Sequence, residues 1–325
     1  MRISQVLAKN ITFPPLPTKI EFSQYSRALA TLKKNRAFLA STLAADEITK
    51  EFGPNLWDGK TVVELFPGPG VLTRSMIKNG ASGIIPLEPA KIFLPMLKSL
   101  EDCCDVPFYL EHGEHRADDT FHSLLEDVSQ KFQTKVERPK VDWNEVHPSM
   151  VFSSLSSSIN ESYHLSMLLV YSIFRRDGWF KYGRLPVVML APPEILKGIQ
   201  TASLVGFLWR AVADVETSIE LSSDAFVTKR SMQAIKLIPS VVPKIQAPLE
   251  TYHFILSKLM VRKAQSLSSS LAAIAPGAAT IRSKLTFDAY KNCSRLTLSE
   301  VDQVTLKYIE WYKNRHGAAP IHAFV

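Results

Sequence analysis

The sequence predicts an α/β protein built around a Rossmann-like βαβ unit, and three observations support this prediction. Residues 61–65 are apolar or β-branched except for the acid Glu64, which is typical of a buried strand that leads into a site. Gly68 and Gly70 follow as a tight turn, and an amphipathic run then ends at Asn79-Gly80, a pair suited to a helix C-cap. Strand, glycine turn and helix in this order make the first half of a βαβ unit, whose turn lets the backbone approach a ligand.

The residues after the turn narrow the kind of ligand. A dinucleotide fingerprint needs a third glycine three residues after Gly70, and this chain has Thr73 there. A second strand, 83–88, ends in an acid, Glu88, whose carboxylate could accept hydrogen bonds from ribose hydroxyls. Both nucleotide cofactors and S-adenosylmethionine use this arrangement. The alternative is a βα turn that only packs against the core.

The turn also carries a resemblance to a known family. Residues 64–73, E-L-F-P-G-P-G-V-L-T, resemble the E-I-G-P-G-x-G-x-L-T motif of the rRNA adenine dimethyltransferase superfamily, whose members bind S-adenosylmethionine. The segments 36–39, 187–194 and 252–263 are similar to other blocks of that superfamily. This resemblance implies a Rossmann-like S-adenosylmethionine-dependent methyltransferase fold with a smaller helical C-terminal domain.

The same resemblance implies a cofactor site, in altered form. Its residues would be Glu64, Phe66, Gly68, Gly70, Glu88 and Glu114. Phe66 stands where the enzymes have a small glycine, and an aromatic residue there is a feature of fungal mitochondrial transcription factors of this superfamily. The ring would fill space that the enzymes leave for the methionine part of the ligand. We therefore expect a vestigial site that binds S-adenosylmethionine weakly or not at all.

The segment that should carry catalysis lacks the family residues. The enzymes end a strand in N-L-P-Y, in which Asn and a backbone carbonyl hold the target amino group while Tyr stacks on an extruded base. Here residues 151–158 read V-F-S-S-L-S-S-S, and Phe152 lies inside the apolar strand. Adenine methylation would lose its positioning residues, so we expect no catalytic residues. The serine run can also be interpreted as a solvated loop.

Other elements follow from periodicity and breakers. We expect a helix over 22–52, a short third strand over 106–110 and a buried apolar helix over 163–174. A further apolar helix is expected over 200–215, and the last strands of the sheet, as a hairpin, around 234–242. From Leu249 onward the spacing of apolar residues is purely helical.

These elements predict three parts of the chain. Residues 1–20 would be a targeting segment or a flexible N-terminus, 21–244 the α/β domain and 245–325 the helical domain. The first ten residues contain Arg2 and Lys9, no acid and an amphipathic pattern, which fits a mitochondrial targeting segment. A disordered terminus is the alternative. We expect the protein in the mitochondrial matrix.

The net charge of +7 is concentrated at the two ends of the chain. Residues 1–45 carry seven Lys or Arg and one acid, and residues 241–325 carry eleven and five. Two basic ends on an acidic middle fit contact with phosphates, although Lys-rich solvated helices would produce the same pattern.

Within the chain, residues 175–184 combine cations with aromatic rings. Such a mixture suits single-stranded nucleic acid, because cations meet phosphates while rings stack on bases. The segment leads directly into a strand at 186–191, so some of its rings must pack. The candidate nucleic-acid residues are Arg175, Arg176, Lys181, Tyr182, Arg184, Arg262 and Lys263.

Several classes of protein are disfavoured. No stretch reaches the roughly 18 consecutive apolar residues of a membrane span, so we expect no membrane partner. Cys103 and Cys104 are adjacent and Cys293 stands apart, which matches neither a zinc spacing nor a disulfide framework. His112 and His115 flank Glu114, and a solvated loop explains them better than a metal pair. We predict no metal site.

Three functions remain open. By resemblance, the first is a mitochondrial transcription initiation factor that gives the single-subunit mitochondrial RNA polymerase promoter recognition and melting, as a monomer that contacts melted promoter DNA. The second is a mitochondrial small-subunit rRNA adenine N6-dimethyltransferase, which the missing N-L-P-Y disfavours. The third is a methyltransferase-like scaffold in ribosome assembly. Only the likeness of Phe66 to the fungal transcription factors favours the first function over the third.

Overall fold

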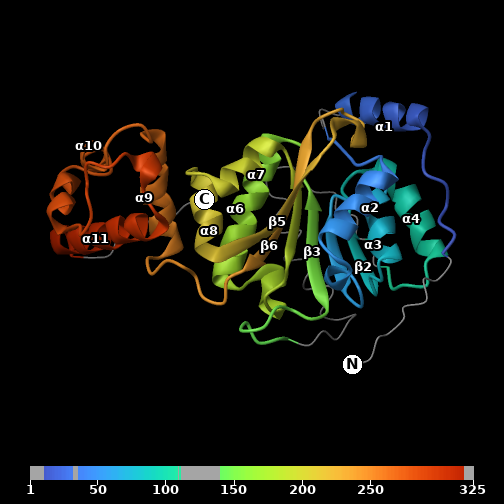
Figure 1. The fold of residues 1–325 in the computed structure, drawn as a ribbon, viewed down its shortest axis with the longest axis horizontal. Helices are drawn as coiled ribbons and strands as arrows, with labels where there is room; N and C mark the ends of the chain where they lie inside the picture. Colours follow the sequence, from blue (N-terminus) through green and yellow to red (C-terminus); the bar gives the residue numbers. More distant parts are fainter. Residues whose placement is uncertain (1–10, 32–35, 109, 111–139, 318–325) are drawn as a thin grey trace.

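The computed structural model describes residues 11–31, 36–108, 110 and 140–317. Its centre is a six-stranded sheet in the order β2-β1-β3-β4-β6-β5, with helices on both faces and a helical region beyond the last strand (Figure 1). The strands are β1 Thr61–Leu65, β2 Gly83–Leu87, β3 Met150–Leu155, β4 Val187–Ala191, β5 Ala213–Leu221 and β6 Met232–Pro239.

The first four strands are parallel, whereas β5 and β6 form an antiparallel pair at one edge. Leu65 pairs with Leu87 on one side and with Ser154 on the other, so β1, β2 and β3 end at nearly the same level. The carboxyl ends of parallel strands form the edge at which α/β proteins bind ligands. This edge therefore presents the residues that follow each strand.

Helices cover the two faces of the sheet and bury two separate hydrophobic clusters. Alternation along β1 sends Val62 into one cluster and Val63 and Leu65 into the other. The first cluster lies under α1 Lys19–Thr31, α2 Thr42–Glu51, α3 Val71–Lys78, the 3₁₀ turn η2 Lys91–Phe93 and α4 Leu94–Cys103. The second lies under α6 Ile159–Arg175, η3 Gly178–Tyr182, α7 Pro193–Gln200 and α8 Leu204–Val212.

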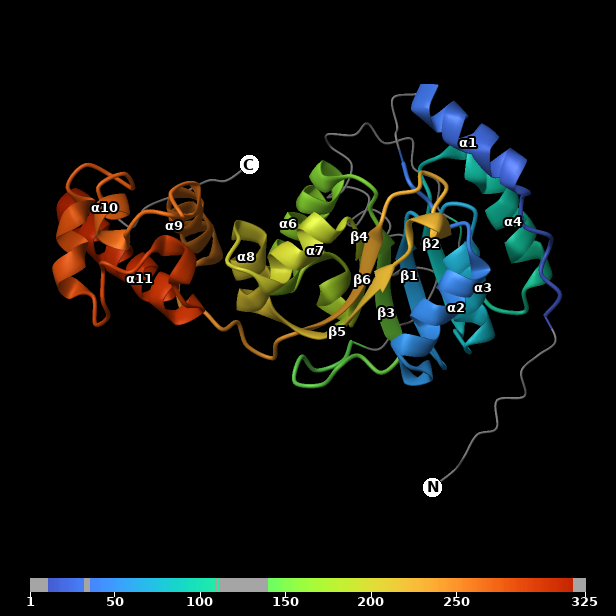
Figure 2. The same ribbon diagram turned by 45° about the horizontal axis from the view of Figure 1, so that its top comes forward.

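The C-terminal helical region forms one end of the elongated molecule (Figures 1 and 2). It consists of α9 Leu249–Val261, α10 Leu267–Leu271, η5 Ala278–Lys284, η6 Cys293–Arg295 and α11 Leu298–His316. Tyr252 and Tyr308 belong to the same buried cluster as Trp209 of α8, and the Asp302 carboxylate accepts hydrogen bonds from the backbone amides of Gln246 and Ala247. The helical region thus packs continuously against the sheet domain, and the predicted fold class is confirmed.

Two expected elements have different boundaries. The predicted helix over 22–52 is wrong in its middle, because residues 36–41 are extended between α1 and α2. The amides of Ala40 and Ser41 donate to the carbonyl of Ala225, and Leu39 forms a bridge with Phe226. The predicted strand over 106–110 is reduced, among the described residues, to a bridge between Phe108 and Ile84. In residues 36–41, pairing with residues about 185 positions away along the chain therefore outweighs the helical spacing of the apolar residues.

The two antiparallel strands, β5 and β6, also have boundaries that differ from those expected. The predicted helix over 200–215 ends at Val212, where β5 begins, and the hairpin is formed by β5 and β6 rather than within 234–242. Strand β5 is largely exposed at the edge, so its sequence lacks the apolar run by which buried strands are recognised. No helix in the described part of the chain is long and apolar enough to cross a membrane.

Candidate functional site

The turn after β1 keeps a conformation that glycine favours even where glycine is absent. Phe66, Gly68 and Gly70 all have positive φ angles, of 64°, 61° and 77°. Few side chains other than glycine adopt this region, and an aromatic residue there is strained by roughly 1–3 kcal/mol. By resemblance, position 66 is glycine in the enzymes. The chain therefore retains the enzymes' backbone path with a residue that fits it poorly.

Protein side chains lie directly behind both glycines of the turn. A Cβ atom on Gly68 would be 3.0 Å from Cβ of Phe38, and one on Gly70 would be 3.1 Å from Cδ2 of Leu97. Both glycines are needed for close packing between the turn and its own core. This packing matches the alternative interpretation of the turn, in which the glycines serve the fold.

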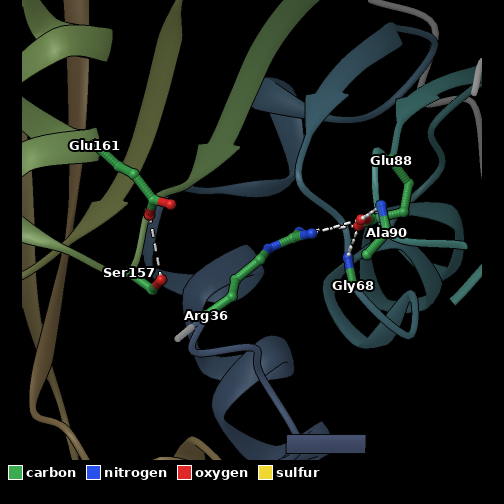
Figure 3. Close-up of polar contacts among 6 residues, drawn as sticks. All are labelled: Arg36, Gly68, Glu88, Ala90, Ser157 and Glu161. Atoms are coloured by element: carbon green, nitrogen blue, oxygen red, sulfur yellow. Dashed lines mark hydrogen bonds and ion pairs between the residues drawn. The ribbon is translucent and has the colours of Figure 1, made fainter. Parts of the chain in front are cut away.

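Glu88, the acid expected to hold a ribose, is engaged by the protein itself (Figure 3). Its Oε1 accepts from Nη1 of Arg36 at 2.5 Å and from the amide of Ala90 at 2.7 Å. Its Oε2 accepts from Nη2 of Arg36 at 2.9 Å and from the amide of Gly68 at 2.9 Å. The Glu88 side chain is 0% exposed.

These four donors saturate the carboxylate. An ionised carboxylate offers about four lone-pair positions, and all four are used here. The Arg36 guanidinium also lies 4.8 Å from the Phe66 ring centroid and 5.8 Å from that of Phe93. In this conformation the residues do not fit the ribose of S-adenosylmethionine, because its hydroxyls would find no acceptor on Glu88 and Arg36 occupies the space beside it.

The sequence contained only part of this arrangement. Arg36 lies in the segment 36–39 that resembles the family, but no local pattern indicated that it pairs with an acid 52 positions further along the chain. The guanidinium reaches Glu88 because residues 36–41 are extended rather than helical. Arg36 is thus the site residue that sequence reasoning missed, and its proximity to the motif was the available signal.

Glu64, at the end of β1, is buried beneath the same turn. Burial raises its pKa to about 8, and the nearby Glu88 carboxylate adds to the rise, while a hydrogen bond from Thr73 and the charge of Arg36 oppose it. Oγ1 of Thr73 donates to Oε2 of Glu64 at 2.6 Å. Thr73, at the position of a third glycine, therefore satisfies a buried acid that is protonated at neutral pH.

The end of β3 is packed rather than solvated. Ser153, Ser154, Ser156 and Ser157 are all buried, so the interpretation of the serine run as a solvated loop is wrong. The hydroxyls of Ser156 and Ser162 are 2.7 Å apart, which ties the strand end to α6. Phe152 is 0% exposed and belongs to the core, as expected.

Ser157, two residues after the end of β3, has further partners (Figure 3). Oγ of Ser157 donates to Oε2 of Glu161 at 3.3 Å, and Nη1 of Arg230 donates to the Ser157 carbonyl at 3.4 Å. Ser158 caps α6 by accepting from the amide of Glu161 at 3.1 Å. The strand end thus offers small hydroxyls and a carbonyl, and residues 156–158 provide no aromatic face for a base.

The rings of segment 175–184 are in the core. Trp179 and Phe180 are each 2% exposed and Tyr182 is 8% exposed. The base-stacking role expected of Tyr182 does not fit this burial, because a base needs an open ring face. The segment precedes β4, and its rings belong to the same buried cluster as residues of that strand and of α6.

The arginines of this segment bond to protein groups. Arg175 pairs with Glu250 at 2.8 Å, Nη2 of Arg176 donates to the Val241 carbonyl at 3.3 Å, and Arg184 donates to the carbonyls of Pro239 and Asn144. Helix α6 begins just after the carboxyl end of β3 and runs back along the sheet. Its last residue, Arg175, therefore lies near the amino ends of the parallel strands, away from the glycine turn. The structure therefore does not bring this segment together with the turn at Gly68.

Three other expected site residues are also separate from the turn. Arg262 and Lys263 are exposed at the end of α9 in the helical region, and Lys181 lies 5.3 Å from the Tyr182 ring. Glu114 lies outside the described residues, as do His112 and His115. Within the described ranges, no group of three or more His, Cys, Asp or Glu is placed to hold a metal ion.

Replacing Arg184 by Ala tests whether this segment is structural. We expect the free energy of unfolding to fall by about 1–2 kcal/mol, because two hydrogen bonds to carbonyls are lost. Urea denaturation measures the change, and Lys140→Ala, an exposed cation of the neighbouring loop, is the matched control. Unchanged stability together with weaker nucleic-acid binding would instead assign Arg184 to a phosphate contact.

Comparisons with known proteins extend these observations. No family model matches the chain. Mitochondrial dimethyladenosine transferase 1 of Vermamoeba vermiformis is 22% identical over 341 residues, covering 94% of this chain and 98% of that protein. The human protein of the same name is 26% identical over 246 residues, covering 73% of this chain and 67% of that protein.

Among solved structures, a dimethyladenosine transferase from Plasmodium falciparum aligns with a TM-score of 0.55 and 14% identity, covering 87% of this chain and 99% of that one. This likeness establishes a Rossmann-like S-adenosylmethionine-dependent methyltransferase fold with a helical C-terminal region. The homologues are mitochondrial proteins. The chain is a distant homologue, 22–26% identical, of proteins named mitochondrial dimethyladenosine transferase 1.

Proposed function

We propose that the chain is a transcription initiation factor of the mitochondrial matrix. It confers promoter recognition and melting on the single-subunit mitochondrial RNA polymerase and transfers no methyl group. The observation that carries the proposal is the Glu88 carboxylate, which holds Arg36 and the amides of Gly68 and Ala90 where a ribose would otherwise bind. A protein whose own side chains fill its cofactor site can still bind nucleic acid and protein partners, although it transfers no methyl group.

The end of β3 supports the same conclusion. Positioning an adenine amino group for methyl transfer requires paired acceptors and a stacking ring, and residues 156–158 are serines. Two basic ends remain for phosphate contact, and by resemblance Phe66 is a feature of fungal mitochondrial transcription factors. A protein with these properties can stabilise strand-separated promoter DNA, as a monomer bound to the polymerase.

A second function is favoured by the comparisons. The chain aligns over 94% of its length with a mitochondrial dimethyladenosine transferase 1, which favours a mitochondrial small-subunit rRNA adenine N6-dimethyltransferase. That function requires the Arg36–Glu88 pair to open when the cofactor binds. A scaffold in ribosome assembly shares the RNA partner without the chemistry.

Run-off transcription with purified mitochondrial polymerase on a promoter template distinguishes these functions. We expect promoter-specific transcripts only when the chain is added, and no incorporation of labelled methyl groups into unmodified small-subunit rRNA. Transcripts independent of the chain, together with labelled adenine, would establish the enzyme instead. A pull-down from mitochondria identifies the scaffold if ribosomal proteins, and no polymerase, are recovered.

Binding of S-adenosylmethionine is a separate prediction. We expect isothermal titration calorimetry to show no binding in the low micromolar range, because the acceptors of Glu88 are saturated and Phe66 adds a ring, 4.8 Å from the Arg36 guanidinium, where the enzymes have glycine by resemblance. The fold should still be intact, as monitored by circular dichroism of the same sample. A dissociation constant of a few micromolar would contradict this prediction.

A further inference from the structure

Two segments of the helical region lie side by side. Residues 262–268, which run from the end of α9 into the first turn of α10, are antiparallel to residues 288–295, with a bridge between Ser266 and Asn292. The amides of Leu267 and Ser268 donate to the carbonyls of Lys291 and Ala289, and those of Cys293 and Ser294 donate to Gln265 and Lys263. We call these two segments the basic ribbon.

The basic ribbon is held in place by the core beneath it. Leu267 and Cys293 are each 0% exposed, and Ala289 is 6% exposed, so both segments are anchored by buried side chains. A surface whose backbone is paired and anchored presents its exposed side chains in a defined geometry. Such preorganisation reduces the conformational entropy lost when a ligand binds.

The charge of the basic ribbon is strongly positive. It contains four Lys or Arg and one acid, Asp288. Arg262, Lys263 and Arg295 are exposed, and none of the three forms an ion pair within the described part of the chain. Lys291 differs, because it pairs with Glu300 at 2.9 Å.

The acids of the helical region do not neutralise these three cations. Glu250 pairs with Arg175, Glu310 pairs with Lys284 and Lys307, and the Asp302 carboxylate accepts from backbone amides. Asp288 accepts from the amide of Tyr290 at 2.8 Å. The three cations are thus available for an anion from outside the chain.

The basic ribbon also contains an exposed aromatic ring. Tyr290 is 69% exposed, in contrast to the buried rings of segment 175–184. The Arg282 guanidinium lies 5.8 Å from the Tyr290 ring centroid and donates to Oγ of Ser268 at 3.2 Å, which places a further cation beside the ring. The ring thus has one cation beside it and is otherwise largely exposed to solvent.

Cations beside an open ring fit single-stranded nucleic acid better than duplex. Phosphates of either form meet Arg and Lys, but only an unpaired base offers a face to a ring. We infer that the basic ribbon binds single-stranded nucleic acid, with phosphates on Arg262, Lys263 and Arg295 and a base on Tyr290. The inference rests on the proposed function for the class of partner, and it deepens that function by placing the strand on the helical region.

Fluorescence anisotropy of the full chain tests this inference. The probes are a labelled 20-nucleotide DNA strand, an RNA strand of the same sequence and the corresponding DNA duplex, each measured at several salt concentrations without polymerase. In the triple variant Arg262→Ala, Lys263→Ala, Arg295→Ala we expect the magnitude of the salt slope to fall by about 2, since each phosphate contact on a single strand contributes about 0.7. The matched control replaces Lys258, Lys284 and Lys307, three other cations of the helical region, by Ala.

Tyr290→Ala tests the ring. We expect binding of the single strands to weaken by about 5- to 150-fold and binding of the duplex to change by less than about twofold, because stacking requires an unpaired base. Thermal unfolding of each variant establishes that the fold is retained, which the exposure of all four replaced side chains favours.

Each outcome bears on the inference. An unchanged salt slope in the triple variant, equal losses for strand and duplex in Tyr290→Ala, or the same effect in the control variant would overturn it, as would a wild-type chain that binds no strand. Tighter binding of DNA than RNA points to melted promoter, and the reverse points to a transcript or rRNA. Strand binding that persists while promoter-specific transcription fails would refute the proposed function and leave the basic ribbon intact.

Discussion

Replacing Arg36 by Ala is expected to destabilise the chain by about 3–5 kcal/mol, because the buried Glu88 carboxylate then loses its charge partner. The Arg36 and Glu88 side chains are 8% and 0% exposed, so water cannot replace the lost contacts. Urea unfolding followed by circular dichroism measures the change as a lower midpoint at an unchanged slope. This is the largest stability effect that we expect from a single charge in the described structure.

The double variant Arg36→Ala, Glu88→Gln separates the charge from the packing. A neutral amide does not need a buried cation, so we expect part of the lost stability to return. Arg175→Ala is the matched control, because its pair with Glu250 is exposed and worth at most about 1 kcal/mol. A loss below about 1 kcal/mol in Arg36→Ala would show that Glu88 finds other partners, and the proposed closure of the ribose site would be wrong.

Glu64 is expected to make stability fall as pH rises. Its pKa is about 8 in the folded chain and near 4.5 when unfolded, so between these values the folded state binds one proton more. The free energy of unfolding then decreases with pH across this window, by at most about 1.4 kcal/mol per pH unit. Below about pH 4.5 both states are protonated, and the contribution is fully present.

The variant Glu64→Gln isolates this contribution. Gln cannot ionise, so the variant lacks this pH dependence. The unfolding free energy of the wild type minus that of the variant should therefore decrease as pH rises from 5 to 8. His253, whose pKa is lowered by burial, is present in both proteins and cancels in the difference. Parallel pH profiles for the two proteins, measured by urea unfolding, would show that Glu64 is not protonated in the folded chain.

The two predictions describe one local arrangement. Glu64 lies near the end of β1 and Glu88 follows the neighbouring strand β2, and a single guanidinium cannot neutralise two buried carboxylates at low cost. Arg36 pairs with Glu88, and Glu64 keeps its proton with help from Thr73. The turn is therefore satisfied by groups of the chain itself.

Local sequence patterns were enough to locate the centre of the fold. The apolar run 61–65, the glycine turn and the acid at 88 are local patterns, and each was observed as β1, the turn and the residue after β2. Periodicity likewise located α6 and the start of α9. Such elements are predictable because their hydrophobic spacing is set by residues a few positions apart.

The contacts that these elements make depend on the folding of the whole chain. Arg36 meets Glu88 across 52 positions, Tyr182 is buried, and residues 262–268 pair with 288–295. The mixture of rings and cations at 175–184 suggests contact with nucleic acid, yet its rings are buried, whereas Tyr290 in the helical region is 69% exposed. Burial and long-range pairing depend on where the whole chain places each side chain, and the spacing of neighbouring residues does not encode that placement.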